Sequence, residues 1–438
     1  MRKFIILIAA ALAMAGSAQE KGAHDYGDFT VDAQVRARGE YRGGMSSDGK
    51  DKLSVNDRVR LSFGWERKNL SMKVSAQHSG LWQSASQKNT AGKITLHEAW
   101  AKMTFGKGFF TQVGRQELAY DDERLLGTLD WAPSGRAHDA LRLGWENRWN
   151  KLHAVVSFNQ TAEVQSGSST SSRLYKNLQM LWYRLGPDEK PFHISTTFIN
   201  QGVDDVRYDS IRYMQTFGIY ASFEKRKIST DFSIYYQTGR DRTGADQRAF
   251  MMSGNFGWQF ARKWKGTIGD DYLSGSDGMP GTNRTFNVLY GTHHKFLGTM
   301  DNFGYNTIPL YGLNDLHLNF AYNCSEKFDM SLAYHWFATG RPINDYLKDP
   351  IEQLTDPAKI AIMRRYYGKY RFSQNLGGEL DLQFNYCPWK DVCIQGGFSL
   401  MFATESMRFI KDTTSKVQKW GWLSFNINPT VFSTRNRK

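Results

Sequence analysis

Apolar and polar residues alternate one by one along most of this chain. The first run sets Phe29, Val31, Ala33, Val35 and Ala37 against Thr30, Asp32, Gln34, Arg36 and Arg38. Because successive side chains of a β-strand point to opposite faces, this pattern predicts a strand with one apolar and one polar face. We count eighteen such runs, from 29–41 to 418–432, and predict an all-β chain.

The first eighteen residues have the pattern of a secretory signal peptide. Arg2 and Lys3 precede an apolar run from Phe4 to Ala15, and small residues follow as far as Ala18. The run is shorter than the roughly 20 residues that a membrane-spanning helix needs, which disfavours the alternative of an anchor helix. We expect cleavage after Ala18 and export from the cytoplasm.

The remaining chain contains no apolar stretch of 18 residues, so in a membrane only a closed barrel satisfies its backbone hydrogen bonds. Two-residue connections such as Lys68-Asn69 and Arg226-Lys227 alternate with long hydrophilic ones. Outer-membrane barrels have this arrangement of short periplasmic turns and long extracellular loops. We therefore predict a single closed antiparallel transmembrane β-barrel of about 18 strands in the outer membrane of a Gram-negative bacterium, in contact with its lipid.

The predicted organisation has four parts. A signal peptide at 1–18 is followed by a short periplasmic segment at 19–28, the barrel at 29–432 and a tail at 433–438. The barrel region contains no Pro-rich or Ser-rich linker, and its alternating pattern is uniform from end to end, which favours one domain.

The net charge is +13, or +11 once Arg2 and Lys3 are removed, and it favours an anionic partner. All eight short turns carry a cation at or beside them: Arg67, Lys107, Lys151, Lys190, Arg226, Arg262, Lys327 and Lys390. Much of the excess positive charge is therefore expected at the periplasmic rim, where the alternative role is simple solvation.

A second group of charged residues falls on the polar phase of the strands and should face the lumen. The cations are Arg36, Arg38, Arg58, Arg60, Lys73, Arg142 and Arg148, and the anions are Asp32, Glu40, Glu98, Glu146, Glu379 and Asp381. Guanidinium groups on a channel wall bind carboxylates or phosphates weakly and repeatedly, as passage of an anion requires. The alternative is that these ions pair with one another and only stiffen the barrel.

Three stretches resemble the bacterial alginate export family of outer-membrane barrels. The first contains Gly114-Arg115-Gln116-Glu117, Asp122-Glu123-Arg124-Leu125, Trp131, Gly135-Arg136, Asp139 and Leu141-Arg142-Leu143. The others are Asp271 to Asp277 and Thr292 to Gly298 with Asp301. The chain departs from the family pattern at Gly291, His293 and Leu297.

The resemblance implies an 18-stranded barrel with an arginine-rich constriction that passes a polyuronate. By match of motif, the constriction would consist of Arg115, Arg124, Arg136 and Arg142, with Asp122, Glu123 and Asp139 as their partners. Arg115 has the alternative of an outward or structural salt bridge. Expected partners are an anionic polysaccharide or a small anionic solute, and periplasmic export components.

Other chemistry receives little support. Cys387 and Cys393 flank a predicted turn and would suit a disulfide, while three cysteines without ligand spacing favour no metal site. His193 and Ser195 share a strand face without an orienting partner, so we predict no enzyme and no cofactor. Adjacent His293 and His294 cannot chelate one ion from a strand, and a secreted chain is not expected to bind nucleic acid.

Three functions from different classes remain: a channel for an anionic polysaccharide, a porin for small anionic or sugar-like solutes, and an outer-membrane enzyme or adhesion barrel. Long loops at 118–139, 275–313 and 340–372 would narrow a channel if they fold into it. The residues from Asn344 to Arg365 have partly helical spacing and predict a short helix at the mouth.

Overall fold

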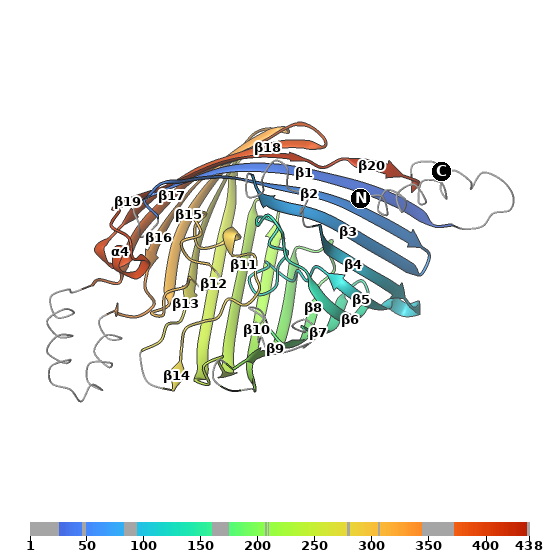
Figure 1. Cartoon of the computed structure of the whole chain (residues 1–438), viewed down its shortest axis with the longest axis horizontal. Helices are drawn as coiled ribbons and strands as arrows, with labels where there is room; N and C mark the ends of the chain where they lie inside the picture. Colours follow the sequence, from blue (N-terminus) through green and yellow to red (C-terminus); the bar gives the residue numbers. More distant parts are fainter. Residues whose placement is uncertain are drawn as a thin grey trace.

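The structure is a computed structural model that describes residues 26–45, 50–82, 94–159, 175–205, 208, 210–277, 281–304, 307–343 and 372–435. Within them, eighteen antiparallel strands form one closed barrel, β1 to β13 and β15 to β19 (Figure 1). The predicted fold class and strand number are confirmed. The predicted signal peptide and the predicted helix from Asn344 to Arg365 lie outside the described residues.

The first half of the barrel consists of β1 (Asp28–Gly43), β2 (Lys52–Arg67), β3 (Leu70–Leu81), β4 (Thr95–Thr104), β5 (Phe109–Gln116), β6 (His138–Glu146), β7 (Asn150–Phe158), β8 (Asn177–Leu185) and β9 (Phe192–Asp204). The second half consists of β10 (Ile211–Lys225), β11 (Ile228–Arg240), β12 (Asp246–Ala261), β13 (Trp264–Leu273), β15 (Leu313–Ser325), β16 (Phe328–Ala338), β17 (Asn375–Trp389), β18 (Val392–Ala403) and β19 (Val417–Ile427).

The barrel closes where β19 pairs with β1, from Val35 opposite Ile427 to Gly43 opposite Lys419. The predicted last strand is divided. After β19 the strand is interrupted at Pro429, because proline has no backbone N–H to donate to a neighbouring strand. The short strand β20 (Thr430–Ser433) then pairs with the start of β1. The barrel pairing therefore extends one residue beyond the predicted limit at 432.

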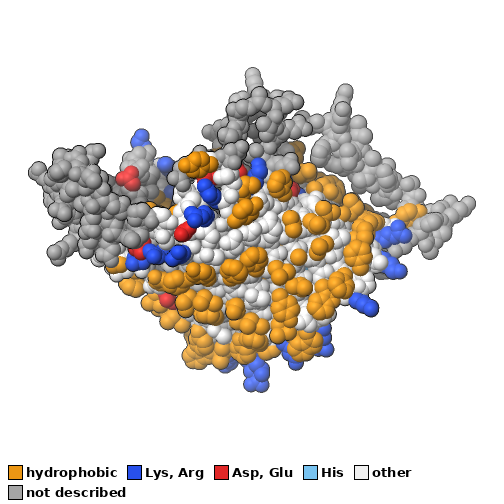
Figure 2. Space-filling model, turned by 90° about the horizontal axis from the view of Figure 1, so that it is seen from below, with side chains coloured by type: hydrophobic (Ala, Val, Ile, Leu, Met, Phe, Trp, Pro, Cys, Tyr) orange, Lys and Arg blue, Asp and Glu red, His pale blue; other side chains and the backbone are white. Residues whose placement is uncertain are grey.

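The outer surface carries the apolar phase of the strands. On β11 the side chains of Phe232, Ile234 and Tyr236 are exposed, whereas Ser233 and Gln237 are buried inside. Figure 2 shows hydrophobic side chains spread over the visible outer face, with Lys and Arg mostly at its margins. This outer face is suited to lipid, and the polar phase is left to fill the interior.

The connections are short at one end of the barrel and mostly long at the other. Two residues join β2 to β3, β10 to β11, β12 to β13, β15 to β16 and β17 to β18. The long connections include 117–137 between β5 and β6, and 274–312 between β13 and β15. The start of β1 and the end of β19 both lie at the short-turn end, beside Glu66 and Val392.

A few small elements complete the described chain. They are η1 (Gly106–Gly108), β14 (Thr282–Asn283), η2 (His293–Lys295) and α4 (Glu405–Lys411). None of the described helices is long and apolar enough to cross a membrane. A disulfide joins Cys387 to Cys393 across the β17–β18 turn, and Cys324 is a free thiol.

Candidate functional site

The lumen of the barrel is occupied by two connections, which we call the inner loops: residues 117–137 and residues 281–304. The loops contact each other directly. The Thr292 hydroxyl donates to Glu123 Oε2 at 2.7 Å, Arg136 Nη1 donates to the Gly291 carbonyl at 2.9 Å, and the Trp131 and His294 rings stack with centroids 3.9 Å apart. Gly291 permits this approach, because an added Cβ would lie 2.0 Å from the Arg124 carbonyl oxygen.

One end of the first inner loop is held by arginines of β1 and β2. Arg36 Nη1 donates to the Asp130 carbonyl at 2.7 Å, and Arg38 Nη1 donates to the Trp131 carbonyl at 2.7 Å. Arg58, whose side chain is 0% exposed, donates at 2.6 Å to both the carboxylate and the carbonyl of Asp130. The Arg38 guanidinium also lies 3.7 Å from the Trp131 ring centroid, a cation–π contact.

Arg36, Arg38, Arg58 and Arg60 form what we call the arginine wall, and carboxylates balance its positive charge only in part. Asp130 pairs with Arg36 and Arg58, and Glu40 pairs with Arg38 and Arg42. Burial alone would raise the pKa of Asp130, but Arg58 and Arg36 hold it below its ordinary value, so the carboxylate is charged. The predicted lumen-facing residues Arg36, Arg38, Arg58 and Arg60 therefore lie together, and three of them position the loop.

The other end of the loop is tied to β12 and β13 by Arg124. Its guanidinium donates to both oxygens of Asp271 at 3.0 and 2.8 Å, to Ser253 Oγ at 2.7 Å and to Asp122 Oδ2 at 2.9 Å. The side chain is buried and stacks on Phe296 at 4.0 Å. Arg124 thus anchors the loop, with the predicted partner Asp122, and does not present a free charge to a solute.

Arg115 and Asp139 lie on the outer face and not in the constriction. They face each other across β5 and β6 in the same phase as the exposed Val113 and Leu141, and their side chains are 42% and 50% exposed. Regular alternation from Phe110 turns Gln116 inward and Arg115 outward. The expectation that this pair lines the lumen is therefore incorrect, and the alternative of an outward salt bridge applies.

A row of three polar side chains crosses the lumenal face of β4, β5 and β6 on the short-turn side of the inner loops. It consists of Lys102, Gln112 and Arg142. Arg142 Nη2 donates to Gln112 Oε1 at 2.5 Å, and Lys102 Nζ lies 4.0 Å from the Phe110 ring. Among the described residues, neither Lys102 nor Arg142 has a carboxylate within ion-pair distance. Lys73 is different, because it pairs with Glu98.

A cavity of about 390 Å³ adjoins this row. Arg142, Arg184 and Lys151 line it together with Glu146, His153 and Asp121. Lys151 and Arg184 share the carboxylate of Asp188, at 2.8 and 2.9 Å. The predicted lumenal Arg148 instead pairs with Glu189 at the short-turn end, and both side chains are exposed.

Sequence reasoning missed Lys102 and Arg184. Lys102 has the same strand phase as the predicted lumenal Glu98, so its orientation was available from the pattern. Arg184 follows inward Leu178, Met180 and Trp182 on β8, while Leu181 faces outward. Because both faces of β8 are apolar, the sequence does not show which of its residues face the lumen.

The family model described as alginate export matches residues 29–415 of the chain. Solved structures with the same fold include the outer membrane protein OprD from Pseudomonas aeruginosa, with a TM-score of 0.59 at 10% identity, covering 92% of this chain and 94% of that chain. Another is OccAB4 from Acinetobacter baumannii, with a TM-score of 0.60 at 10% identity and coverage of 92% and 98%. A search of curated proteins finds no significant match.

Proposed function

We propose, since the chain belongs to the alginate export family and is an outer-membrane channel of a Gram-negative bacterium, that its solute is an anionic polysaccharide of the polyuronate class. The observation that supports this most directly is a pair of lumenal cations, Lys102 and Arg142, that have no carboxylate partner among the described residues. A guanidinium and an ammonium that remain available can hold a uronate carboxylate transiently and release it.

Other lumenal cations add to this pair. The arginine wall of β1 and β2 holds more cations than carboxylates, and Arg184 lines the cavity next to Arg142. The predicted constriction residues divide by role in this proposal. Arg142 contacts the solute, Arg124, Arg136, Asp122 and Glu123 fix the inner loops, and Arg115 with Asp139 stays outside.

The short-turn end supplies the entry for a solute that comes from the periplasm. Its turns carry Lys and Arg residues, among them Lys107, Arg226 and Lys327. Positive charge around an opening raises the local concentration of an anion. Periplasmic export components would deliver the polymer to this rim.

No catalytic role is proposed for the polar residues at this end. Ser195 Oγ donates to Asp121 Oδ1 at 2.6 Å, while His193 Nε2 lies 2.9 Å from the Pro187 carbonyl. A nucleophilic serine needs the imidazole as its own hydrogen-bond partner. Here the Ser195 hydroxyl and the His193 imidazole are hydrogen-bonded to other groups and not to each other.

A porin for small anionic or sugar-like solutes is the second candidate. The inner loops favour it, because they are fixed to the wall at both Arg58 and Arg124 and so narrow the lumen. The two candidates differ in whether a long polyuronate enters the pore.

Ion selectivity tests the proposal. Purified protein in planar bilayers should be anion-selective, and K102Q/R142Q should lower the anion-to-cation permeability ratio severalfold. R115Q is the matched control, since it removes a cation from the outer face and should leave the ratio unchanged. Cation selectivity of the wild type, or equal ratios in K102Q/R142Q and wild type, would contradict the proposal.

A further inference from the structure

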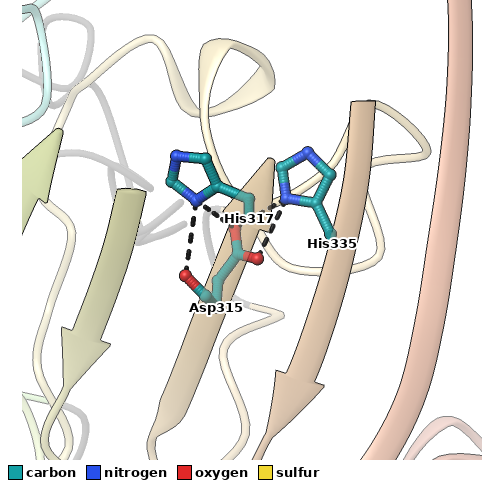
Figure 3. A group of neighbouring side chains, drawn as sticks. All are labelled: Asp315, His317 and His335. Carbon is teal, nitrogen blue, oxygen red and sulfur yellow. Dashed lines mark hydrogen bonds and ion pairs between the residues drawn. The ribbon is translucent and has the colours of Figure 1, made fainter. Parts of the chain in front are cut away.

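Two histidines and an aspartate meet on the lumenal face of β15 and β16 (Figure 3). Asp315 and His317 belong to β15, and His335 lies directly opposite His317 on β16. His335 Nδ1 is 2.9 Å from each carboxylate oxygen of Asp315, and His317 Nδ1 is 3.7 Å from Asp315 Oδ2. The potential ligand atoms of the three side chains all lie within 4.8 Å of one another.

These separations suit a small divalent ion. With zinc–ligand bonds of about 2.0–2.1 Å in a tetrahedron, neighbouring ligand atoms are about 3.3 Å apart. The observed 2.9 and 3.7 Å lie on either side of that value, so small rotations of the side chains would bring one nitrogen of each imidazole and one carboxylate oxygen to a common centre. The carboxylate of Asp381 is a further donor, 3.7 Å from His335 Nε2.

The surrounding charge also favours a cation. Asp315, Glu379 and Asp381 are almost completely buried, with relative exposures of 0%, 0% and 2%. Arg124 balances the neighbouring Asp271 but forms no ion pair with these three. Glu379, opposite His335 on β17, has a buried Oε2 atom without a hydrogen-bond partner among the described residues. Asp315 is paired with His335, Asp381 accepts from the Thr299 hydroxyl at 2.6 Å, and Glu379 Oε1 accepts from the Met300 backbone N–H at 2.9 Å. No lysine or arginine forms an ion pair with these three carboxylates among the described residues, and a divalent cation would reduce the cost of burying them.

The cluster is accessible from the lumen. His317, His335 and Asp381 line a cavity of about 530 Å³ together with His294 and Trp131 of the inner loops. Three protein ligands beside open space leave a coordination position for water or a solute. Imidazole with carboxylate is a donor set for zinc, copper and nickel rather than for calcium or magnesium.

We propose that Asp315, His317 and His335 bind one divalent transition-metal ion of the zinc class in the channel wall. The bound ion would offset the buried charge of the carboxylates of β15 and β17. Metal binding here does not depend on the identity of that solute.

A second group of potential ligands, His97, Glu98 and Glu117, carries no such proposal. It contains one histidine, and Glu98 is already held by Lys73 and by the Trp100 indole at 2.9 Å. His97 is bound to Glu117 at 2.8 Å. This group therefore supplies a matched control.

Zinc titration of the chelator-stripped, detergent-purified chain by calorimetry tests the site. The wild type should bind one Zn²⁺ per chain with high affinity. H317Q/H335Q should weaken binding by more than about 100-fold, since loss even of outer partners of a metal site costs about 10–100-fold. D315N should also weaken it, and H97Q should bind as the wild type does.

Each variant is first checked for a folded barrel by its shift in gel mobility on heating, and D315N provides a second measurement if the double variant does not fold. The proposal is overturned if the wild type binds no Zn²⁺. It is equally overturned if H317Q/H335Q or D315N retains wild-type affinity, or if H97Q loses the ion.

Discussion

Asp271 and Asp139 each form a bidentate ion pair with an arginine, but the first pair is buried and the second is partly exposed. Arg124 of the first inner loop and Asp271 of β13 are buried, whereas Asp139 and Arg115 are about half exposed on the outer face. Removing one partner of a buried pair leaves an uncompensated charge and costs about 3–5 kcal/mol, while exposed pairs contribute about 0–1 kcal/mol.

The same substitution at both positions should therefore separate them. We expect D271N to lower the free energy of unfolding by about 3–5 kcal/mol and D139N by less than about 1 kcal/mol. Guanidinium titration in lipid vesicles, followed by tryptophan fluorescence, measures both. Equal effects of the two variants would show that Arg124 does not anchor the loop as described.

Asp121 makes stability depend on pH. Burial raises the pKa of its carboxyl to about 6, although Ser195 and Trp182 donate hydrogen bonds to it. This value lies above the unfolded one of about 4, so on acidification the folded chain takes up a proton that the unfolded chain does not bind. Asp121 therefore makes the free energy of unfolding rise as the pH falls from 7.5 to 5, by about 1 kcal/mol.

D121N should remove this contribution. The difference in free energy of unfolding between wild type and D121N should change by about 1 kcal/mol over the same pH interval, in favour of the wild type at pH 5. Titrations at both pH values measure the change. A difference that does not vary with pH would mean that Asp121 is already charged at pH 5.

At the scale of elements, the first inner loop is a strap held at two points on the wall. Arg36, Arg38 and Arg58 bind its backbone between Asp130 and Ala132, and Arg124 ties its beginning to β12 and β13. Replacing residues 129–135 by Gly-Ser-Gly should open the lumen beside the arginine wall and raise single-channel conductance severalfold. Unchanged conductance, with the barrel still folded by gel mobility, would show that the loop does not narrow the pore.

Most strands were predictable from the sequence because they follow one rule, the alternation that separates lipid from lumen, to which β8 with its two apolar faces is an exception. The contents of the lumen follow no such rule. Arg124 lies in a loop without periodicity, and its partner Asp271 is 147 positions away, so the buried pair is visible only in the folded chain. Likewise, the proposed metal site has no signature in the sequence, because His317 and His335 meet through strand pairing and not through spacing.

For some predicted site residues, the strand pattern correctly shows whether the side chain faces the lumen or the outer surface; for others, the motif led to the wrong face. Arg36, Arg38, Arg58 and Arg60 sit in long regular runs, and the structure places all four on the inner face. Arg115 was assigned to the lumen by motif, although the phase of its own strand turns it outward. Where motif and strand phase disagree, the phase is the physical constraint, because a single-residue shift would place the apolar side chains in the lumen.

At the scale of the whole molecule, charge is distributed unevenly around the lumen. Arginines cluster on β1 and β2, and buried carboxylates gather on β13, β15 and β17. Lys102 on β4 and Arg142 on β6 have no carboxylate partner in the described part of the chain. A passing polyanion would therefore follow the β1 to β6 side of the barrel, where cations exceed anions. Under the proposed function, this asymmetry would make the channel prefer anionic sugars over neutral ones.

Single-channel recording with added polymer tests that preference most directly. Polymannuronate on the short-turn side should interrupt the current at concentrations where a neutral glucan of similar length has no effect, and K102Q/R142Q should weaken the block severalfold while R115Q does not. Equal block by the two polymers, or no block by either, would contradict passage of an anionic polysaccharide through this channel.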